Sequence, residues 1–200
     1  RWLVLSAAAY TFAPFHMVNI YVRGDSLAEF WAMAFYPWVF LAGERVVSSF
    51  EFRVSSFGVP ARRRLIWLYS GLNTDTVFFA LAYAGLILSH NISALIFTPF
   101  LLLYVLLRLA HSRKNYLYHA FAFSLAVLLA LALSAWFWLP ALGEQELAQL
   151  GPVTEGYFHY SNHFRGRDLI QPSFFFNYDI TSGANPFRMG LTQTLLTGLG

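Results

Sequence analysis

The sequence predicts an all-α fold: a polytopic transmembrane helical bundle of about five to six spans in this fragment, with an extracytoplasmic loop region. Five apolar runs divide the chain, and all but the short second one have roughly the 17 to 25 residues that cross a bilayer. Hydrophobic residues make up 58% of the chain and charged residues only 12%, about half the charged fraction of an ordinary soluble domain. Basic residues crowd every second gap between the runs, which is the positive-inside pattern.

The first two spans are expected at about residues 2–22 and 28–42. Pro14 should bend the first span, because proline removes a backbone hydrogen bond. The second span is short and rich in aromatic residues. Residues 43–64 that follow are polar and basic, and they indicate a loop on the inner side with an amphipathic piece around residues 46–57.

The next three spans are expected at about residues 65–88, 92–109 and 116–139. Almost no turn separates the first two, which predicts a tight helical hairpin. The last ends in a Trp-rich segment before Pro140, as is common at a membrane interface. The bundle domain therefore covers residues 1–141.

Residues 142–188 are polar and rich in Gly, Pro and Asn, and they predict an extracytoplasmic loop region with short helices. Residues 189–200 are expected to start a further span. Because the chain begins without Met and stops within an apolar stretch, we expect an internal piece of a longer protein.

The distribution of basic residues orients the bundle, because nine of the thirteen fall in gaps on one side, the predicted cytoplasmic side. They are Arg1, Arg45, Arg53, Arg62, Arg63, Arg64, Arg108, Arg113 and Lys114. These residues flank apolar runs and form no separate basic domain, which argues against a nucleic-acid partner and favours the lipid bilayer. Cysteine is absent, which excludes disulfides and thiolate zinc sites.

Three charged residues lie between the first two spans, and they allow two interpretations. Arg23, Asp25 and Glu29 are either an interfacial salt-bridge group or an outward-facing site. In the second case Arg23 holds a phosphate, and Glu29 or Asp25 accepts a proton from an attacking hydroxyl. Asp25 and Glu29 are four residues apart, so on a helix they share one face.

Histidines provide the next candidates. His90 and Asn91, at the tip of the predicted hairpin, are either polar caps of helix ends or phosphate or metal contacts in the same outer pocket as Arg23. His16 follows the Pro14 bend, where a hydrogen-bonded interior histidine is favoured over one that faces the pocket. No spacing of two histidines and a carboxylate stands out, so we expect no defined metal site.

The outer loop and its flanks supply candidates for sugar binding. Aromatic rings stack on sugars, and polar side chains beside them bind hydroxyl groups; the same residues also suit an ordered loop core or, for the glutamate, a soluble surface. These candidates are Trp136, Trp138, Glu144, Tyr160, Asn162 and His163.

Several of these segments, in this order, resemble one family of large prokaryotic membrane proteins, the "6-pyruvoyl-tetrahydropterin synthase-related" membrane-domain family. The segments are Ala13-Pro14-Phe15-His16, Asn19-Ile20-Tyr21-Val22-Arg23-Gly24, Leu27-Ala28-Glu29, Ser89-His90-Asn91-Ile92-Ser93-Ala94-Leu95, Trp136-Phe137-Trp138-Leu139-Pro140-Ala141-Leu142, Asn162-His163-Phe164 and Phe187-Arg188-Met189-Gly190-Leu191.

The resemblance implies kinship with glycosyltransferases of the GT-C type, in the prokaryotic cytoplasmic membrane. Such enzymes take a sugar from a polyprenyl-phosphate donor at the extracytoplasmic face. An acidic residue in their first outer loop usually acts as base, and that loop is expected upstream of this chain, which makes Glu29 a substitute candidate. No cofactor is implied with certainty, and participation of a divalent metal is left open.

Two alternatives to a glycosyltransferase remain. One is a non-catalytic membrane protein that binds or moves lipid-linked glycans or lipids, which needs the same basic and aromatic pocket but no base. The other is a scaffold in which Arg23 and Glu29 simply pair.

Overall fold

The computed structural model describes residues 2–18, 26–57, 72–111, 116–147, 155, 159, 169–178 and 188–199. Helix accounts for 83% of these residues, which confirms the all-α prediction. The chain divides into two compact units. Unit 1 comprises Arg1–Phe30 with Glu144–Gly200, and unit 2 comprises Trp31–Gly143.

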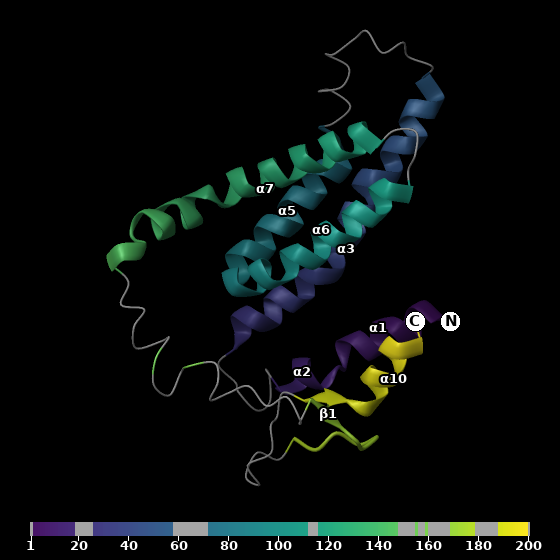
Figure 1. Cartoon of the computed structure of the whole chain (residues 1–200), viewed down its shortest axis with the longest axis vertical. Helices are drawn as coiled ribbons and strands as arrows, with labels where there is room; N and C mark the ends of the chain where they lie inside the picture. The colour runs from purple at the N-terminus through teal and green to yellow at the C-terminus, as the bar shows by residue number, and fades with distance from the viewer. Residues whose placement is uncertain are drawn as a thin grey trace. The chain divides into compact units, whose positions relative to one another are not determined.

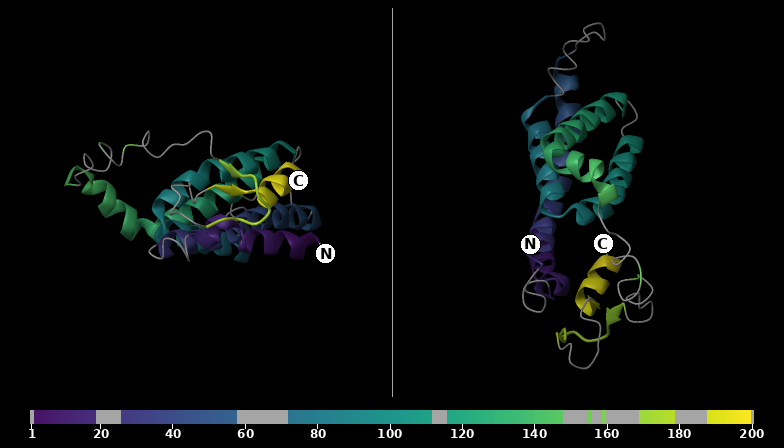
Figure 2. Two further views of the ribbon diagram at one scale, coloured as in Figure 1. Left: turned by 90° about the horizontal axis from the view of Figure 1, so that it is seen from below. Right: turned by 90° about the vertical axis from the view of Figure 1, so that its left-hand side faces the viewer.

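The described part of unit 2 contains four helices that lie side by side (Figures 1 and 2). They are α3 (Leu27–Phe57, from Trp31 onward), α5 (Thr74–Ser89), α6 (Asn91–His111) and α7 (Tyr116–Gly143). A single residue, His90, joins the antiparallel pair α5 and α6. Helix α7 returns in the direction of α5, and its C-terminal end extends past the α5–α6 turn (Figure 1).

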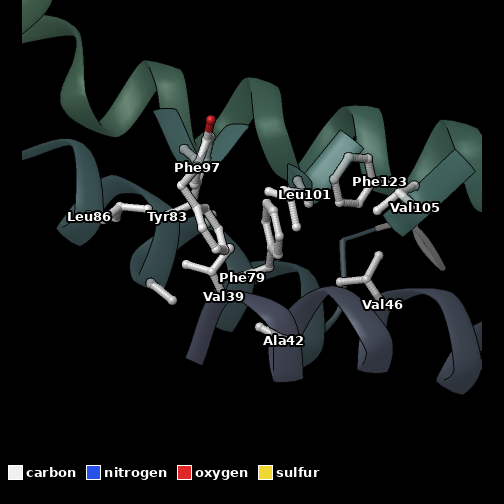
Figure 3. Close-up of a cluster of buried hydrophobic side chains, with 14 of the residues drawn as sticks. Val39, Ala42, Val46, Phe79, Tyr83, Leu86, Phe97, Leu101, Val105 and Phe123 are labelled. Carbon is white, nitrogen blue, oxygen red and sulfur yellow. The ribbon is translucent and has the colours of Figure 1, made fainter. Parts of the chain in front are cut away.

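The core of unit 2 centres on Phe79 of α5, whose side chain is fully buried. Its ring contacts the rings of Tyr83 and Phe123, with centroids 5.7 and 5.2 Å away. Figure 3 shows this ring between Ala42 of α3 and Leu101 of α6. Alanines occupy many of the remaining buried positions, and small residues let helices approach closely. They are Ala32, Ala42, Ala80, Ala82, Ala94, Ala122, Ala126 and Ala130.

The outer surface of unit 2 is also apolar. Eight large apolar side chains of α6 alone are exposed: Ile92, Leu95, Ile96, Phe100, Leu102, Leu103, Leu106 and Leu107. In the part of the chain that the structure describes, two helices are long and apolar enough to cross a membrane, Asn91–His111 and the His119–Gly143 part of α7. Helix α5 is apolar but shorter.

Polar contacts tie the helices of unit 2 together at two levels. Arg108 of α6 donates a hydrogen bond from Nη2 to Oε1 of Glu44 on α3 over 2.6 Å, and the Tyr104 hydroxyl donates to Oε2 over 2.5 Å. On α5, the Tyr83 hydroxyl lies 2.5 Å from Oγ1 of Thr98. Because Thr98 already donates to a carbonyl of its own helix, Tyr83 is the donor in this bond.

Unit 1 combines short helices with one pair of strands. Among its described residues the helices are α1 (Trp2–Thr11), α2 (Pro14–Met17), the 3-10 turn Gln145–Leu147 and α10 (Leu191–Leu199). Strands β1 (Ile170–Gln171) and β2 (Met189–Gly190) pair in parallel, with Ile170 opposite Met189. Gly190 packs closely on α2, since a Cβ atom built there would lie 2.9 Å from Cγ of Pro14.

Helix boundaries differ from the sequence prediction in four places. Helix α5 begins at Thr74, inside the span expected at residues 65–88, because the side chain of Asn73 caps the helix there. Residues 43–57 were expected to be a loop, with at most a separate amphipathic piece, but they continue α3, because Glu44 pairs with α6 and Val46 packs in the core. Pro140 lies inside α7, which runs on to Gly143. At Pro14 the helix is interrupted between Thr11 and Pro14. The parallel strand pair had no counterpart in the prediction.

Candidate functional site

The described residues include seven of the twelve candidate site residues. Arg23, Asp25, Tyr160, Asn162 and His163 lie outside them. His90, Asn91, Trp136 and Trp138 belong to unit 2, whereas His16, Glu29 and Glu144 belong to unit 1. Four of the candidates therefore lie in the same compact unit, and three lie in the other.

His90 caps both helices of the hairpin. Its backbone N–H bonds the carbonyl of Leu86, which closes α5, and its carbonyl accepts the N–H of Ala94, which opens α6. Its ring nitrogen Nδ1 accepts the N–H of Ser93 over 3.2 Å, as the side chain of an N-cap residue does. The capping interpretation of His90 is thus supported by geometry.

The capping bond also fixes where the proton of His90 sits. A backbone N–H can only donate, so Nδ1 is an acceptor, and in the neutral ring the proton must be on Nε2. The Ser93 hydroxyl, 2.8 Å from Nδ1, reinforces this orientation. His90 is only partly buried, so one side chain can hold the turn with Nδ1 and offer an N–H donor with Nε2.

Asn91 follows as the first residue of α6 and is exposed. Its side-chain oxygen accepts the N–H of Ile92 over 2.9 Å, so the amide lies against the start of the helix. The positive end of the α6 dipole and the negative end of the α5 dipole both lie at this turn and oppose each other, so any preference for an anion rests on the side-chain donors. His90 and Asn91 thus place side-chain donors at the hairpin tip.

Two tryptophans lie on α7 at the same end of unit 2. Phe79 and Phe123 are in contact, and α5 and α7 run in the same direction, so the level of His90 corresponds to the part of α7 near Trp136. Trp136 is 71% exposed and presents a ring to its surroundings. Trp138 instead donates its indole N–H to the carbonyl of Leu131 over 2.9 Å, so Trp136 is the better candidate for stacking.

Glu29 lies in the first turn of α3, where its position suits capping of the helix N-terminus. Ser26 is at the N-cap position, with its carbonyl accepting the N–H of Phe30 over 3.1 Å. Glu29 comes three residues later, which is the Ser-x-x-Glu arrangement of a capping box. The sequence contained this signal, and it offers an explanation of Glu29 that needs no catalysis.

His16 and Glu144 lie in contrasting surroundings. His16 is buried, with Nδ1 3.4 Å from the carbonyl of Thr11 and its ring edge-on to Tyr10 at 4.7 Å. These contacts agree with the interior, hydrogen-bonded histidine. Glu144 is exposed just beyond α7, as expected of a solubilising residue. Within the described residues, no group of three or more histidine or carboxylate side chains is placed to hold a metal ion.

No protein-family model, curated protein or solved structure matches this chain. The family resemblance stays a prediction, and the case for a site rests on the geometry of the hairpin tip.

A second polar group lies toward the other end of unit 2. It consists of the contacts of Glu44 with Tyr104 and Arg108. The side chain of His119, near the start of α7, is fully buried. Sequence reasoning did not select these residues. The available signal was the charge of Arg108 and Glu44 beside apolar runs, but Arg108 was interpreted as topology alone and Glu44 was not considered. Both charged side chains are partly exposed, and their ion pair offsets part of the cost of holding a charge beside apolar helices.

Proposed function

We propose that this chain is part of an integral membrane protein of the GT-C glycosyltransferase type, which takes a sugar from a polyprenyl-phosphate donor. Its site lies at the extracytoplasmic face of a prokaryotic cytoplasmic membrane. On unit 2, His90 and Asn91 hold the phosphate and Trp136 stacks on the sugar. Arg23 and Glu29, the further phosphate contact and the candidate base expected from the sequence, belong to unit 1.

Insertion in a membrane is supported by one observation, the large apolar side chains that α6 exposes. Leu95 is 74% exposed and Phe100 64%, and neighbouring side chains repeat this along the whole helix. Monomeric soluble proteins rarely expose continuous apolar surface of this length, because water makes it costly. Lipid tails remove that cost, while the small residues inside the unit let the helices pack closely.

The geometry of the hairpin tip supports the proposal that His90 and Asn91 bind a phosphate. Nε2–H of His90 is a fixed donor, since the ring cannot turn without breaking the cap at Ser93. Donors held in place before the reaction stabilise the charge that develops on a leaving phosphate. A tip between two apolar helices is also where the phosphate of a membrane-embedded lipid comes within reach.

Binding of a polyprenyl phosphate to the full-length protein in detergent tests this part, with two variants of one residue. His90→Asn keeps the N-cap, because asparagine is a preferred capping residue, but removes Nε2–H. We expect its Kd to rise about tenfold or more, since a hydrogen bond to a charged group contributes about 1.5–3 kcal/mol. His90→Ala should weaken binding equally and also lower thermal stability. Wild-type affinity in His90→Asn would restrict His90 to its structural role.

Sugar transfer needs a separate test, because a protein that only binds or moves lipid-linked glycans would use the same tip. Glu29→Gln removes the proton acceptor, yet glutamine still serves in a capping box. Ser26→Ala is the matched control, since it weakens the cap and keeps the carboxylate. An enzyme that uses Glu29 loses transfer in the first variant and retains it in the second. If the wild type binds the lipid without transferring sugar, the binding or moving protein is the better description.

A further inference from the structure

A short loop in unit 1 is closed by one side chain. Gln171, only 5% exposed, accepts the N–H of Asn177 on Oε1 over 2.6 Å and donates from Nε2 to the carbonyl of the same residue over 3.2 Å. The side-chain amide thus pairs with the main chain of Asn177 as a neighbouring strand would. Residues 172–176, named here the Phe loop, are held between these two ends.

The Phe loop presents two aromatic rings outward. Phe174 is 72% exposed and Phe175 is 91% exposed, whereas Phe176 turns back toward Tyr178 with a ring separation of 4.9 Å. The apolar surface continues on the strand pair at the base, where the register partners Ile170 and Met189 are both exposed. Residues 169–178 contain no charged side chain.

We propose that the Phe loop is a membrane-interface anchor, with Phe174 and Phe175 inserted at the boundary between lipid headgroups and acyl chains. This rests on the membrane insertion proposed above. It adds a second contact with the bilayer, made by the outer loop region and not by a spanning helix.

The chemistry of the loop favours lipid over a polar partner. At the headgroup boundary water still reaches the backbone of an irregular segment, and the Gln171 clamp satisfies both backbone polar groups of Asn177 at one end of the loop. A sugar or peptide site needs polar groups placed beside the rings, but the amide of Gln171 is already used in the clamp. A loop of this length reaches the interface but cannot cross the hydrocarbon core.

The test uses single cysteines, because the chain contains none. The intact protein in phosphatidylcholine–phosphatidylglycerol nanodiscs carries a nitroxide at Phe175→Cys, at Leu103→Cys on the exposed side of α6, or at Gln145→Cys on the exposed 3-10 turn. Frequent collision of the nitroxide with oxygen indicates that the label lies in lipid. Frequent collision with a water-soluble nickel chelate indicates that it lies in water. We expect the Phe175 label, like the Leu103 label, to favour oxygen several-fold over the Gln145 label.

The three labels separate the possible failures. A Phe175 label in water beside a Leu103 label in lipid would overturn the anchor and leave membrane insertion intact. Water exposure at both positions would overturn the membrane proposal and the anchor with it. Adding Gln171→Ala to Phe175→Cys should shift the label toward water, because the loop loses its closure. An unchanged oxygen preference would show that insertion does not depend on the clamp.

Discussion

Replacing Gly85 by alanine tests the packing of unit 2, because this glycine lies against an aromatic ring. A Cβ atom at Gly85 would come within 2.6 Å of Cε1 of Phe35, closer than carbon atoms can approach, so α3 or α5 must shift. Gly43, on α3, is the matched control. A Cβ atom there would lie 3.5 Å from the ring of Phe79, which is ordinary contact.

The two substitutions should have opposite signs. Alanine is favoured over glycine inside a helix by about 0.5–1 kcal/mol, and Gly43→Ala should gain that amount. Gly85→Ala has the same gain, but forcing an extra carbon into a packed interface costs about 1–3 kcal/mol. The net result for Gly85→Ala is a loss of about 1 kcal/mol, with Gly43→Ala more stable than the wild type.

Thermal unfolding of the purified protein in detergent measures both effects, and about 1 kcal/mol corresponds to roughly 2–4 °C for a chain of this size. Combining Gly85→Ala with Phe35→Leu should recover part of the loss, because the branched side chain is smaller than the ring. Stabilisation by Gly85→Ala equal to that by Gly43→Ala would refute the close approach of α3 and α5. Loss in the double variant equal to the sum of the single losses would show that Phe35 is not the obstacle.

Three other contacts give quantitative expectations in the same unfolding assay. Asn73→Ala removes the oxygen that caps α5 over 2.9 Å and should cost about 1 kcal/mol, whereas Asn73→Asp should keep most of the stability. Tyr83→Phe loses the bond to Thr98 and should cost about 0.6 kcal/mol, with no added loss once Thr98→Val is present. Glu44→Gln and Arg108→Gln should couple by only about 0.2–1 kcal/mol, because both side chains are more than one-third exposed. A coupling that does not weaken at high salt would contradict that estimate.

Apolar runs predicted the existence of the helices better than their ends. The fourth run, bounded by Asn91 and by basic residues, matches α6 closely, because a continuous apolar stretch between polar flanks leaves little choice. The prediction of a loop at residues 43–57 was wrong because this segment is polar and its local pattern does not show that it is helical. Its helical state depends on packing against α6 through Glu44 and Val46, and a local pattern does not contain that partner.

The candidate site shows a similar division. Sequence placed His90 at a hairpin tip and left capping and phosphate binding as alternatives; the geometry assigns Nδ1 to the cap and leaves Nε2 for the other role. The pairing of the Gln171 side-chain amide with the main chain of Asn177 could not be predicted. A contact made by a single side chain leaves no periodic pattern in the sequence. The Ser26-to-Glu29 capping pattern was readable from sequence alone.

The single-residue link at His90 has a consequence for the order in which the helices associate. Helices α5 and α6 can meet with almost no loop-closure entropy, so their contacts form early. Glu44 and Arg108 are 64 positions apart in the chain, and their ion pair must wait until that hairpin has docked on α3. Weakening the ion pair should therefore speed unfolding and leave the folding rate nearly unchanged. The ion pair between α3 and α6 thus stabilises the docked state of a hairpin that has already formed.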